Sequence, residues 1–489
     1  MLITSFKNTY SRSKLYFGLI AAAALFAGLF LSYVQPGRID TDGGIFSAVA
    51  FKDTHGGKLY ADTWENKPPG IFYLIELFYF LIPSPVYALF VMSLLFMTGL
   101  GAMLFYLFYR YFESFILALL FTGIAVFFIV HPGNIHDGLY TEIYGTCFLI
   151  GSLCFHEYYR KNKTGLSLAF SGIFLGLAPW FKEPFILICL PVLIWFALFI
   201  RDWKSILKLL AFAVAPALLF FAVLAATGSF QPFIETILYN FGYTTGQAKS
   251  SSAEKLDDYY RNLFQPIFGI SCLALILLFK NLNDPKTRKD ALAILFIFIS
   301  SASFVFLSPY NFGHYYFASF VLYFVFIAKQ YDLLRSTGQS FFIAFFIGVI
   351  YYVFHLSEVH RPRFTFRIVP YTPDRIAERL INEKDATLFV DYVNAGRYYA
   401  LTGKVHPAFL PVGLPIHFNK SEKGKQNLER IWKELSGKKP DYLITTHSTS
   451  YFSWHLPESK FYEDNYQRID SIFPPDEYGI YLWKKKQQP

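Results

Sequence analysis

A polar, glycine-rich stretch with several charged side chains lies near the N-terminus, at residues 38–70. It reads RIDTDGGIFSAVAFKDTHGGKLYADTWENKPPG and lies between hydrophobic segments. A polar segment beside a membrane needs no core of its own, so its charged residues call for a functional explanation. The residues that could do chemistry here are carboxylates and one lysine: Asp40, Asp42, Asp53, Asp62, Glu65 and Lys67.

A second polar stretch, residues 131–142 (HPGNIHDGLYTE), carries side chains of the types that bind metals. They are His131, His136, Asp137 and Glu142. Histidines and carboxylates suit zinc and other transition metals, but no helical i,i+4 histidine pair and no cysteine accompanies them. The sequence therefore requires no metal or other cofactor, and a divalent metal at this stretch stays an unsupported alternative.

The composition determines the class of protein to which these stretches belong. Of 489 residues, 54% are hydrophobic and only 16% are charged, which is too apolar and too long for one soluble core. We expect a polytopic α-helical membrane protein that interacts with the lipid bilayer. The formal charge of +9 comes from basic residues in short loops between hydrophobic segments, an orientation signal of membrane insertion, so nucleic acid is not an expected partner.

Hydrophobic segments predict about eleven transmembrane helices. The first, 15–34, lacks a convincing cleavage site and is interpreted as a retained helix. The segment 71–82 is only a dozen residues long and is bracketed by prolines, so we expect an interfacial helix that does not span. The other predicted spans are 86–109, 115–130, 143–158, 166–180, 185–200, 206–226, 266–279, 291–308, 315–328 and 341–355.

This assignment places every strongly basic loop on one side of the membrane, which by the positive-inside rule is the cytoplasmic side. The polar loops then gather on the opposite side, and we expect them to form a cavity at the outer surface. These loops are 38–70, 131–142, Lys182–Glu183, 228–265 and 308–314.

The last part of the chain, residues 356–489, has no run long enough to cross a bilayer. We expect a soluble, extracytoplasmic α/β domain after a transmembrane domain (1–355) whose exterior loop, 35–85, holds interfacial helices. Its predicted helices are 374–382, capped at Thr372, and 427–435, ended by Gly437. Its predicted strands are 386–392, 442–446, 466–473 and 479–483. With no phosphate-binding loop, nucleophile elbow or zinc spacing, it is predicted to be a lid or an acceptor-docking module.

Several motifs together resemble a known family. Asp42 follows the first span, the phrase GKLYADTW at 57–64 precedes Lys67-Pro68-Pro69, and GIFLGLA at 172–178 precedes Lys182. His314-Tyr315-Tyr316 begins a late helix, and an exterior α/β tail follows. This order is similar to polyprenyl-phosphate-sugar-dependent glycosyltransferases of the GT-C fold, which include protein O-mannosyltransferases and aminoarabinose transferases. The resemblance covers most of the chain and is strongest in the first 190 residues.

The resemblance implies roles for individual residues. Asp42 corresponds to the catalytic aspartate, which orients and deprotonates the acceptor hydroxyl. The family usually has glutamate next, where this chain has Gly43, so Asp40 could share the role. Lys67 corresponds to the lysine that contacts the phosphate. The further substrate-binding candidates are Tyr60, Lys182, His314, Asp137 and Glu142, with Asp137 marginally preferred to Glu142 for the acceptor side.

The resemblance thus implies an inverting transferase of the bacterial inner membrane. It would move one sugar from a polyprenyl-phosphate donor to a lipid, glycan or protein acceptor outside the cytoplasm. A transporter or flippase for a lipid-linked or anionic substrate is the alternative, and a receptor or assembly scaffold that presents the tail is a third. A transporter should carry charges inside its spans, whereas these spans are almost free of them, so the pattern favours the enzyme.

Overall fold

The structure is a computed structural model of the whole chain. It describes residues 2–130, 135–200, 202–246, 251–261, 268–308, 312–334, 367–390, 396–409, 411, 422–445, 464–473 and 479–487. The chain divides into two compact units, and each is described by itself. The first unit comprises Met1–Val34, Ser93–Leu218 and Lys249–Arg367, and the second comprises Gln35–Met92, Leu219–Ala248 and Ile368–Pro489.

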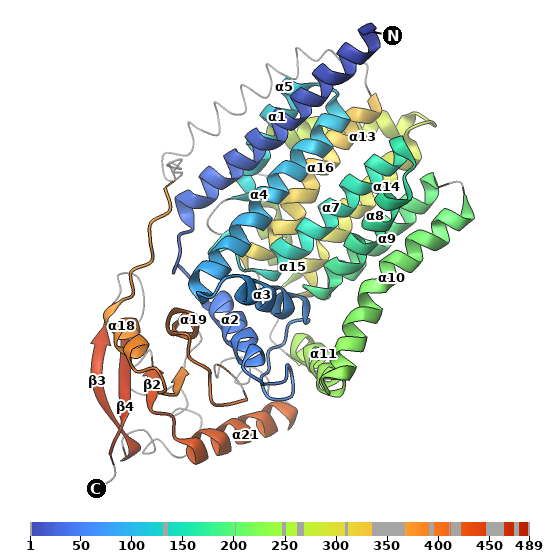
Figure 1. Cartoon of the computed structure of the whole chain (residues 1–489). Helices are drawn as coiled ribbons and strands as arrows, with labels where there is room; N and C mark the ends of the chain where they lie inside the picture. Colours follow the sequence, from blue (N-terminus) through green and yellow to red (C-terminus); the bar gives the residue numbers. More distant parts are fainter. Residues whose placement is uncertain are drawn as a thin grey trace. The chain divides into compact units, whose positions relative to one another are not determined.

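The first unit is helical, and its central helices run side by side (Figure 1). Its helices are α1 (Leu2–Tyr33), most of α4 (Pro85–Phe112), α5 (Phe115–Ile129), α7 (Thr141–Asn162), α8 (Gly165–Leu177), α9 (Phe185–Phe199), most of α10 (Trp203–Ala226), α12 (Ser252–Tyr259), α13 (Phe268–Asn283), α14 (Arg288–Ser301), α15 (Ser303–Leu307) and α16 (Phe317–Leu334), with the 3-10 helices η1 (Ala178–Trp180) and η4 (Gly313–Tyr316). The α-helices coincide with the predicted spans within a few residues at most ends, except that α12 lies in the predicted loop 228–265 and that α14 and α15 share the predicted span 291–308.

Four described helical segments are long and apolar enough to cross a membrane: Ser13–Tyr33, Pro85–Phe112, Trp203–Ala226 and Arg288–Leu307. Five shorter apolar helices accompany them, and one of these, α3 (Gly70–Leu81), coincides with the segment predicted to be an interfacial helix, whose place at the membrane stays a prediction. The predicted span 341–355 lies outside the described residues. The total of about eleven spans therefore stays a prediction.

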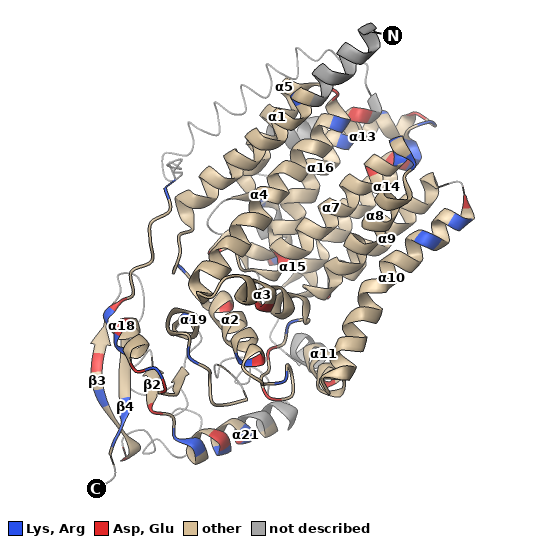
Figure 2. Ribbon diagram, viewed as in Figure 1, with Lys and Arg blue, Asp and Glu red and all other residues tan. Residues whose placement is uncertain are grey.

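Charged residues of the first unit gather at one end of its helices (Figure 2). At this end Glu157 of α7 accepts hydrogen bonds from Arg160, at 3.1 Å, and from Lys329 of α16, at 3.5 Å. Lys329 is 3% exposed and also pairs with Asp332 at 2.7 Å. The predicted span 143–158 thus carries one charged residue near its end, and that charge is buried and paired, as charges at membrane depth usually are.

Glycines let α8 approach α10 closely within the first unit. A Cβ added at Gly172 would lie 2.8 Å from Leu209 O, and one at Gly176 would lie 2.0 Å from Ala213 O. Gly172 and Gly176 are four residues apart, so they share one face of α8, and only residues without a Cβ permit this backbone contact. The motif at 172–178, noted in the sequence for its resemblance, therefore has a packing role.

The second unit combines the N-terminal polar stretch with residues 219–248 and the C-terminal tail, which we define as residues 368–489. Helices α2 (Thr41–Thr54) and α3 pack on each other, and α11 (Phe230–Gly246) belongs to the same unit. The tail contains α18 (Arg375–Asn382), α19 (Arg397–Thr402), α21 (Glu422–Lys438) and one four-stranded sheet of order β1-β2-β4-β3 (Figure 1).

The sheet pairs β1 (Leu388–Val390) with β2 (Tyr442–Thr445) in parallel, and the other neighbours are antiparallel. The remaining strands are β3 (Tyr466–Ile472) and β4 (Ile480–Lys485), so all four predicted strands exist in the described residues, with small differences at their ends.

Two predicted helix ends in the tail are wrong. The N-cap of α18 is Asp374, whose side chain accepts from Ala377 N at 2.8 Å, and not Thr372. An aspartate directly before the first helical residue is as good a cap as threonine, so the local pattern was ambiguous. Helix α21 continues through Gly437 to Lys438, because an isolated glycine near a helix end weakens the helix without having to end it.

The contact between α8 and α10 predicts the effect of a single methyl group. Gly176→Ala should lower the stability of the purified protein by about 1–3 kcal/mol, because the added Cβ overlaps Ala213 O. Thermal unfolding in detergent measures this. Gly99→Ala is the matched control, because its Cβ would meet nothing within 4 Å in α4. Equal unfolding midpoints for the two variants would contradict the close packing of α8 on α10.

Candidate functional site

Helix α2 places Asp42 at its N-terminal end. Asp40 is the N-cap, and its side chain accepts a hydrogen bond from Thr41 N at 2.8 Å. Asp42 lies in the first turn, where a negative charge interacts favourably with the unpaired N–H groups and the helix dipole. The two aspartates that the sequence left as alternatives are thus distinguished: Asp40 caps the helix, and Asp42 stands on its first turn.

The loop 57–67 shapes the backbone around Lys67. Tyr60 has a left-handed φ of 64°, its N–H donates to Thr63 O at 2.6 Å, and its hydroxyl donates to Lys67 O at 2.7 Å. Tyr60 is 2% exposed. The residue predicted to bind substrate therefore fixes the carbonyl group of Lys67, so it supports the lysine through the backbone.

Lys67 and Asp42 meet at one buried carboxyl group. The ammonium of Lys67 lies 3.7 Å from Glu65 Oε1, donates to Asn66 Oδ1 at 2.9 Å, and lies 5.9 Å from the ring centroid of Phe46. Phe46 is four residues after Asp42, so the two side chains share a face of α2. The structure thus brings Asp42 and Lys67, both predicted from sequence, to the same part of the second unit.

Glu65 is the buried acidic residue of this group, and its pKa depends on both neighbours. It is 4% exposed, and burial raises the pKa of its carboxyl above the ordinary value. Lys67 lowers this pKa, whereas the neighbouring Asp42 carboxylate raises it further. An acidic residue, a second acidic residue with a raised pKa and a cation thus share one small volume. Such a group can hold an anion on the cation while an aspartate accepts a proton from a hydroxyl.

The other predicted residues form a separate group in the first unit. Glu142, 1% exposed at the start of α7, accepts a hydrogen bond from Lys182 and lies 3.8 Å from His314 Nε2. The Lys182 ammonium also lies 4.1 Å from the ring centroid of Tyr315, and His314 stacks on Tyr140 at 4.0 Å. Glu142, Lys182 and His314, distant in sequence, are therefore brought together.

Asp137 has a different environment in the same unit. It is 4% exposed, and its side chain accepts from Leu139 N at 2.9 Å, within a turn in which His136 and Gly138 have positive φ. The turn packs closely, because a Cβ at Gly138 would lie 2.9 Å from a carbon of Phe30. Asp137 thus stabilises its own turn.

No cluster of three His, Cys, Asp or Glu side chains suited to a metal occurs among the described residues. His131 lies outside them. The expectation that no metal is required stays a prediction.

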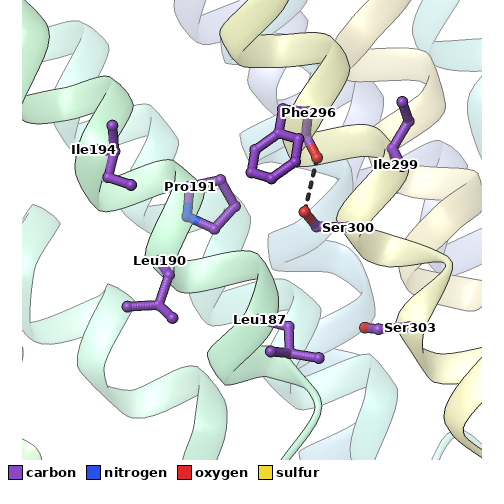
Figure 3. A pocket seen from close by; sticks show the side chains of 8 residues that line it. All are labelled: Leu187, Leu190, Pro191, Ile194, Phe296, Ile299, Ser300 and Ser303. Carbon is purple, nitrogen blue, oxygen red and sulfur yellow. Dashed lines mark hydrogen bonds between the residues drawn. The ribbon is translucent and has the colours of Figure 1, made fainter.

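A lateral pocket of about 390 Å³ lies between α9 and α14–α15 of the first unit (Figure 3). Its lining is apolar apart from two hydroxyl groups: Leu187, Leu190, Pro191, Ile194, Phe296, Ile299, Ser300 and Ser303. Ser300 donates to Phe296 O at 2.8 Å, whereas the buried Ser303 Oγ has no partner among the described residues. The pocket therefore suits an apolar chain.

Sequence reasoning missed several residues of the Asp42–Lys67 group. Glu65 was noticed only as one of six charges, and Asn240 of α11, which donates to Asn66 O at 2.6 Å, lay in a loop where no helix was predicted. For Glu65, the signal was its position two residues before Lys67. For Asn240, the apolar positions within 230–246 could have indicated a helix, but not its partner.

No protein-family model matches the sequence, and no curated protein does. Crystal structures of ArnT from Cupriavidus metallidurans are similar to this chain. The form bound to undecaprenyl phosphate has a TM-score of 0.56 and 14% identity, covering 95% of this chain and 96% of that one. The apo form has a TM-score of 0.58 and 14% identity, covering 95% and 97%.

An oligosaccharyltransferase from Archaeoglobus fulgidus aligns with 12% identity over 94% of this chain and 72% of its own length. Its TM-score of 0.48 is too low to support an inference about fold. The two ArnT structures match nearly full length in both chains, and they are the basis for assigning the fold. The chain therefore has the membrane GT-C fold that its sequence motifs predicted.

Proposed function

We propose that this protein is an inverting glycosyltransferase that moves a sugar from a polyprenyl-phosphate carrier to an acceptor outside the cytoplasm. The observation that carries the proposal is the group formed by Asp42, Glu65 and Lys67 in a chain with the GT-C fold. Glycosyl transfer from a phosphate ester needs a carboxylate as base and a cation at the phosphate, and Asp42 and Lys67 lie beside the buried Glu65.

The reaction assigns one task to each residue. The acceptor oxygen attacks the anomeric carbon from the face opposite the phosphate, and its proton passes to the Asp42 carboxylate. The bond between the anomeric carbon and the phosphate oxygen breaks, and polyprenyl phosphate leaves with the added negative charge. Lys67 stabilises that charge. Placement of such a base typically contributes roughly 10²–10⁴-fold to the rate.

The carrier's chemistry is supported by the ArnT structure, which was solved with undecaprenyl phosphate bound. A long isoprenoid chain also needs an apolar surface beside the membrane. The pocket between α9 and α14–α15 offers one, with leucine, isoleucine, proline and phenylalanine side chains (Figure 3). We assign this pocket to the isoprenoid chain of a lipid substrate.

Glu142, Lys182, His314 and Asp137 are proposed to serve the acceptor or the donor from the first unit. Lys182 is already paired with Glu142, so it can bind an anion only in exchange for, or together with, that carboxylate. We propose an extracytoplasmic site in a bacterial inner membrane. Glu142 lies in the first turn of α7, whereas Arg160 and Lys161 lie in its last turn, the basic end that the positive-inside rule assigns to the cytoplasm.

Asp42→Asn tests the proposed base. The variant should lose transfer by at least about 10²-fold, because an amide cannot accept the acceptor's proton. It should still bind undecaprenyl phosphate, since Lys67 remains. Transfer from radiolabelled polyprenyl-phosphate sugars and binding of undecaprenyl phosphate measure the two properties. Asp40→Asn is the companion variant, expected to weaken the α2 cap but to retain transfer. Full transfer by Asp42→Asn would remove Asp42 from the mechanism.

Lys67→Met tests the phosphate contact. Binding of undecaprenyl phosphate should weaken by about tenfold or more, because a charge-assisted contact is lost while the side-chain length is kept. Lys58→Met, an exposed lysine of the same stretch, is the control and should bind as the wild type does. Equal binding by Lys67→Met and Lys58→Met would exclude Lys67 as the phosphate ligand.

The raised pKa of Glu65 predicts that binding of undecaprenyl phosphate depends on pH. Its folded-state pKa is raised, so as the pH falls towards and through that value Glu65 becomes neutral and no longer competes for Lys67. Undecaprenyl phosphate should therefore bind more tightly at the acidic end of a titration begun above pH 4.5. Glu65→Gln should bind tightly throughout. The phosphate group of the ligand also ionises, but it does so equally in both titrations, so the difference between the wild type and Glu65→Gln reports Glu65 alone. Parallel binding curves for the two proteins would contradict the role of Glu65.

A further inference from the structure

We infer that the C-terminal tail is a positioning element of the Asp42–Lys67 site, acting through residues 396–409. Two sets of contacts within the second unit carry the inference: α19 packs against α2, and residues 406–409 pack against the loop that carries Lys67. The inference rests on the proposed function for the meaning of the site, and on described contacts for the role of the tail. In this role the tail aligns the site residues, whereas the lid or docking module predicted from the sequence would cover the site or bind the acceptor.

The first contact is between backbones. A Cβ added at Gly44 would lie 2.4 Å from Arg397 N and 2.6 Å from Gly396 C, so α2 and the start of α19 touch without a side chain between them. Gly44 is two residues after Asp42, on the same helical turn. Since a backbone contact cannot yield as a flexible side chain does, α19 determines where the first turn of α2 lies.

The second contact holds the loop before Lys67. Thr63 Oγ1 hydrogen-bonds to His406 Nε2 at 2.9 Å, and Trp64 N donates to Phe409 O at 2.9 Å. Thr63 is fully buried, and His406 and Trp64 are 1% and 4% exposed. The rings of Trp64 and Phe409 stack with centroids 6.5 Å apart. Buried hydrogen bonds of this kind fix a single backbone position.

The same loop is held from its other side by α11. Trp64 Nε1 donates to Thr236 Oγ1 at 2.8 Å, and the indole ring meets Tyr239 edge-on at 5.0 Å. Trp64 therefore lies between residues of the tail and residues of α11, three positions before Lys67. Its displacement in either direction would move the lysine, because only Glu65 and Asn66 intervene.

The segment 406–409 is itself held in place by α2 and α21. Lys52 Nζ donates to Ala408 O at 2.7 Å, and Phe409 N donates to Glu434 at 2.5 Å. Arg430 stacks on Phe409 at 3.8 Å and donates to Ala61 O at 3.0 Å. Burial lowers the pKa of Lys52 to about 8, in keeping with an ammonium group that is partly withdrawn from water. The tail and the N-terminal stretch are thus connected through side chains of both.

Thr63→Val isolates this connection, because it removes one hydroxyl and keeps the shape. We expect undecaprenyl phosphate to bind roughly 3- to 10-fold more weakly, since a buried hydrogen bond that aligns Lys67 is lost. Hydrogen exchange of the amides at 60–67 should become faster. Thr54→Val is the matched control: its exposed hydroxyl hydrogen-bonds only locally, to Phe51 O at 2.8 Å and to His55 Nδ1 at 3.2 Å, so both readouts should match the wild type.

His406 provides a second variant pair in case Thr63→Val folds poorly. His406→Gln can keep a hydrogen bond at the position of Nε2 and should restore most of the binding, whereas His406→Leu should not. Gly44→Ala should also weaken binding, while Gly437→Ala, where the new Cβ would meet nothing within 4 Å, should not.

The outcomes separate this inference from the proposed function. If the wild type does not bind undecaprenyl phosphate, the proposed function fails, and the exchange measurement alone still shows whether the tail holds the loop. If the wild type binds but Thr63→Val and His406→Leu bind equally well, the positioning role of the tail is overturned. Unchanged exchange at 60–67 in both variants overturns it as well. Weaker binding together with faster exchange, reversed in His406→Gln, supports it.

Discussion

The interaction between Lys67 and Glu65, beside Asp42, is the constraint on which the rest of the site depends. A buried carboxyl group is costly when ionised, and a partly buried ammonium group is stabilised by a counter-charge. Here each partly satisfies the other at 3.7 Å, while the Asp42 carboxylate opposes ionisation of Glu65. A bound phosphate would therefore replace the Glu65 carboxylate as the anion that pairs with Lys67. Binding of the donor is in this way linked to the protonation of Glu65.

Such an exchange requires a rigid surrounding structure, because charges in a low-dielectric site interact strongly over small displacements. The second unit supplies rigidity through contacts between segments far apart in the chain. Residues near 60 meet residues near 236 and near 408 through hydrogen bonds and aromatic contacts. Their mutual burial is what gives the lysine and the aspartate fixed positions.

The sequence predicted those features that depend on local pattern, and missed those that depend on tertiary contacts. Hydrophobic length predicted most helices of the first unit, and alternating β-rich runs predicted the four strands. Asp42 and Lys67 were recognised by resemblance, and their closeness followed from lying in one short stretch. The partnership of Thr63 with His406 joins residues 343 positions apart. No periodicity encodes such a pair, and the caps at Thr372 and Gly437 failed because several local signals competed there.

Lysine paired with glutamate occurs twice among the proposed site residues, and the shared arrangement suggests a common physical reason. Lys67 faces Glu65 in the second unit, and Lys182 faces Glu142 in the first, where the carboxyl group is 1% exposed. A lysine left unpaired in an apolar surrounding would tend to lose its proton and with it its affinity for phosphate. A neighbouring carboxylate keeps the ammonium charged until substrate arrives, and in the group of Lys67 and Glu65 the Asp42 carboxylate is a second one. The glutamate then competes with the substrate phosphate for the lysine. A phosphate has more charge and more acceptor oxygens than one carboxylate, so it can displace the glutamate from the lysine.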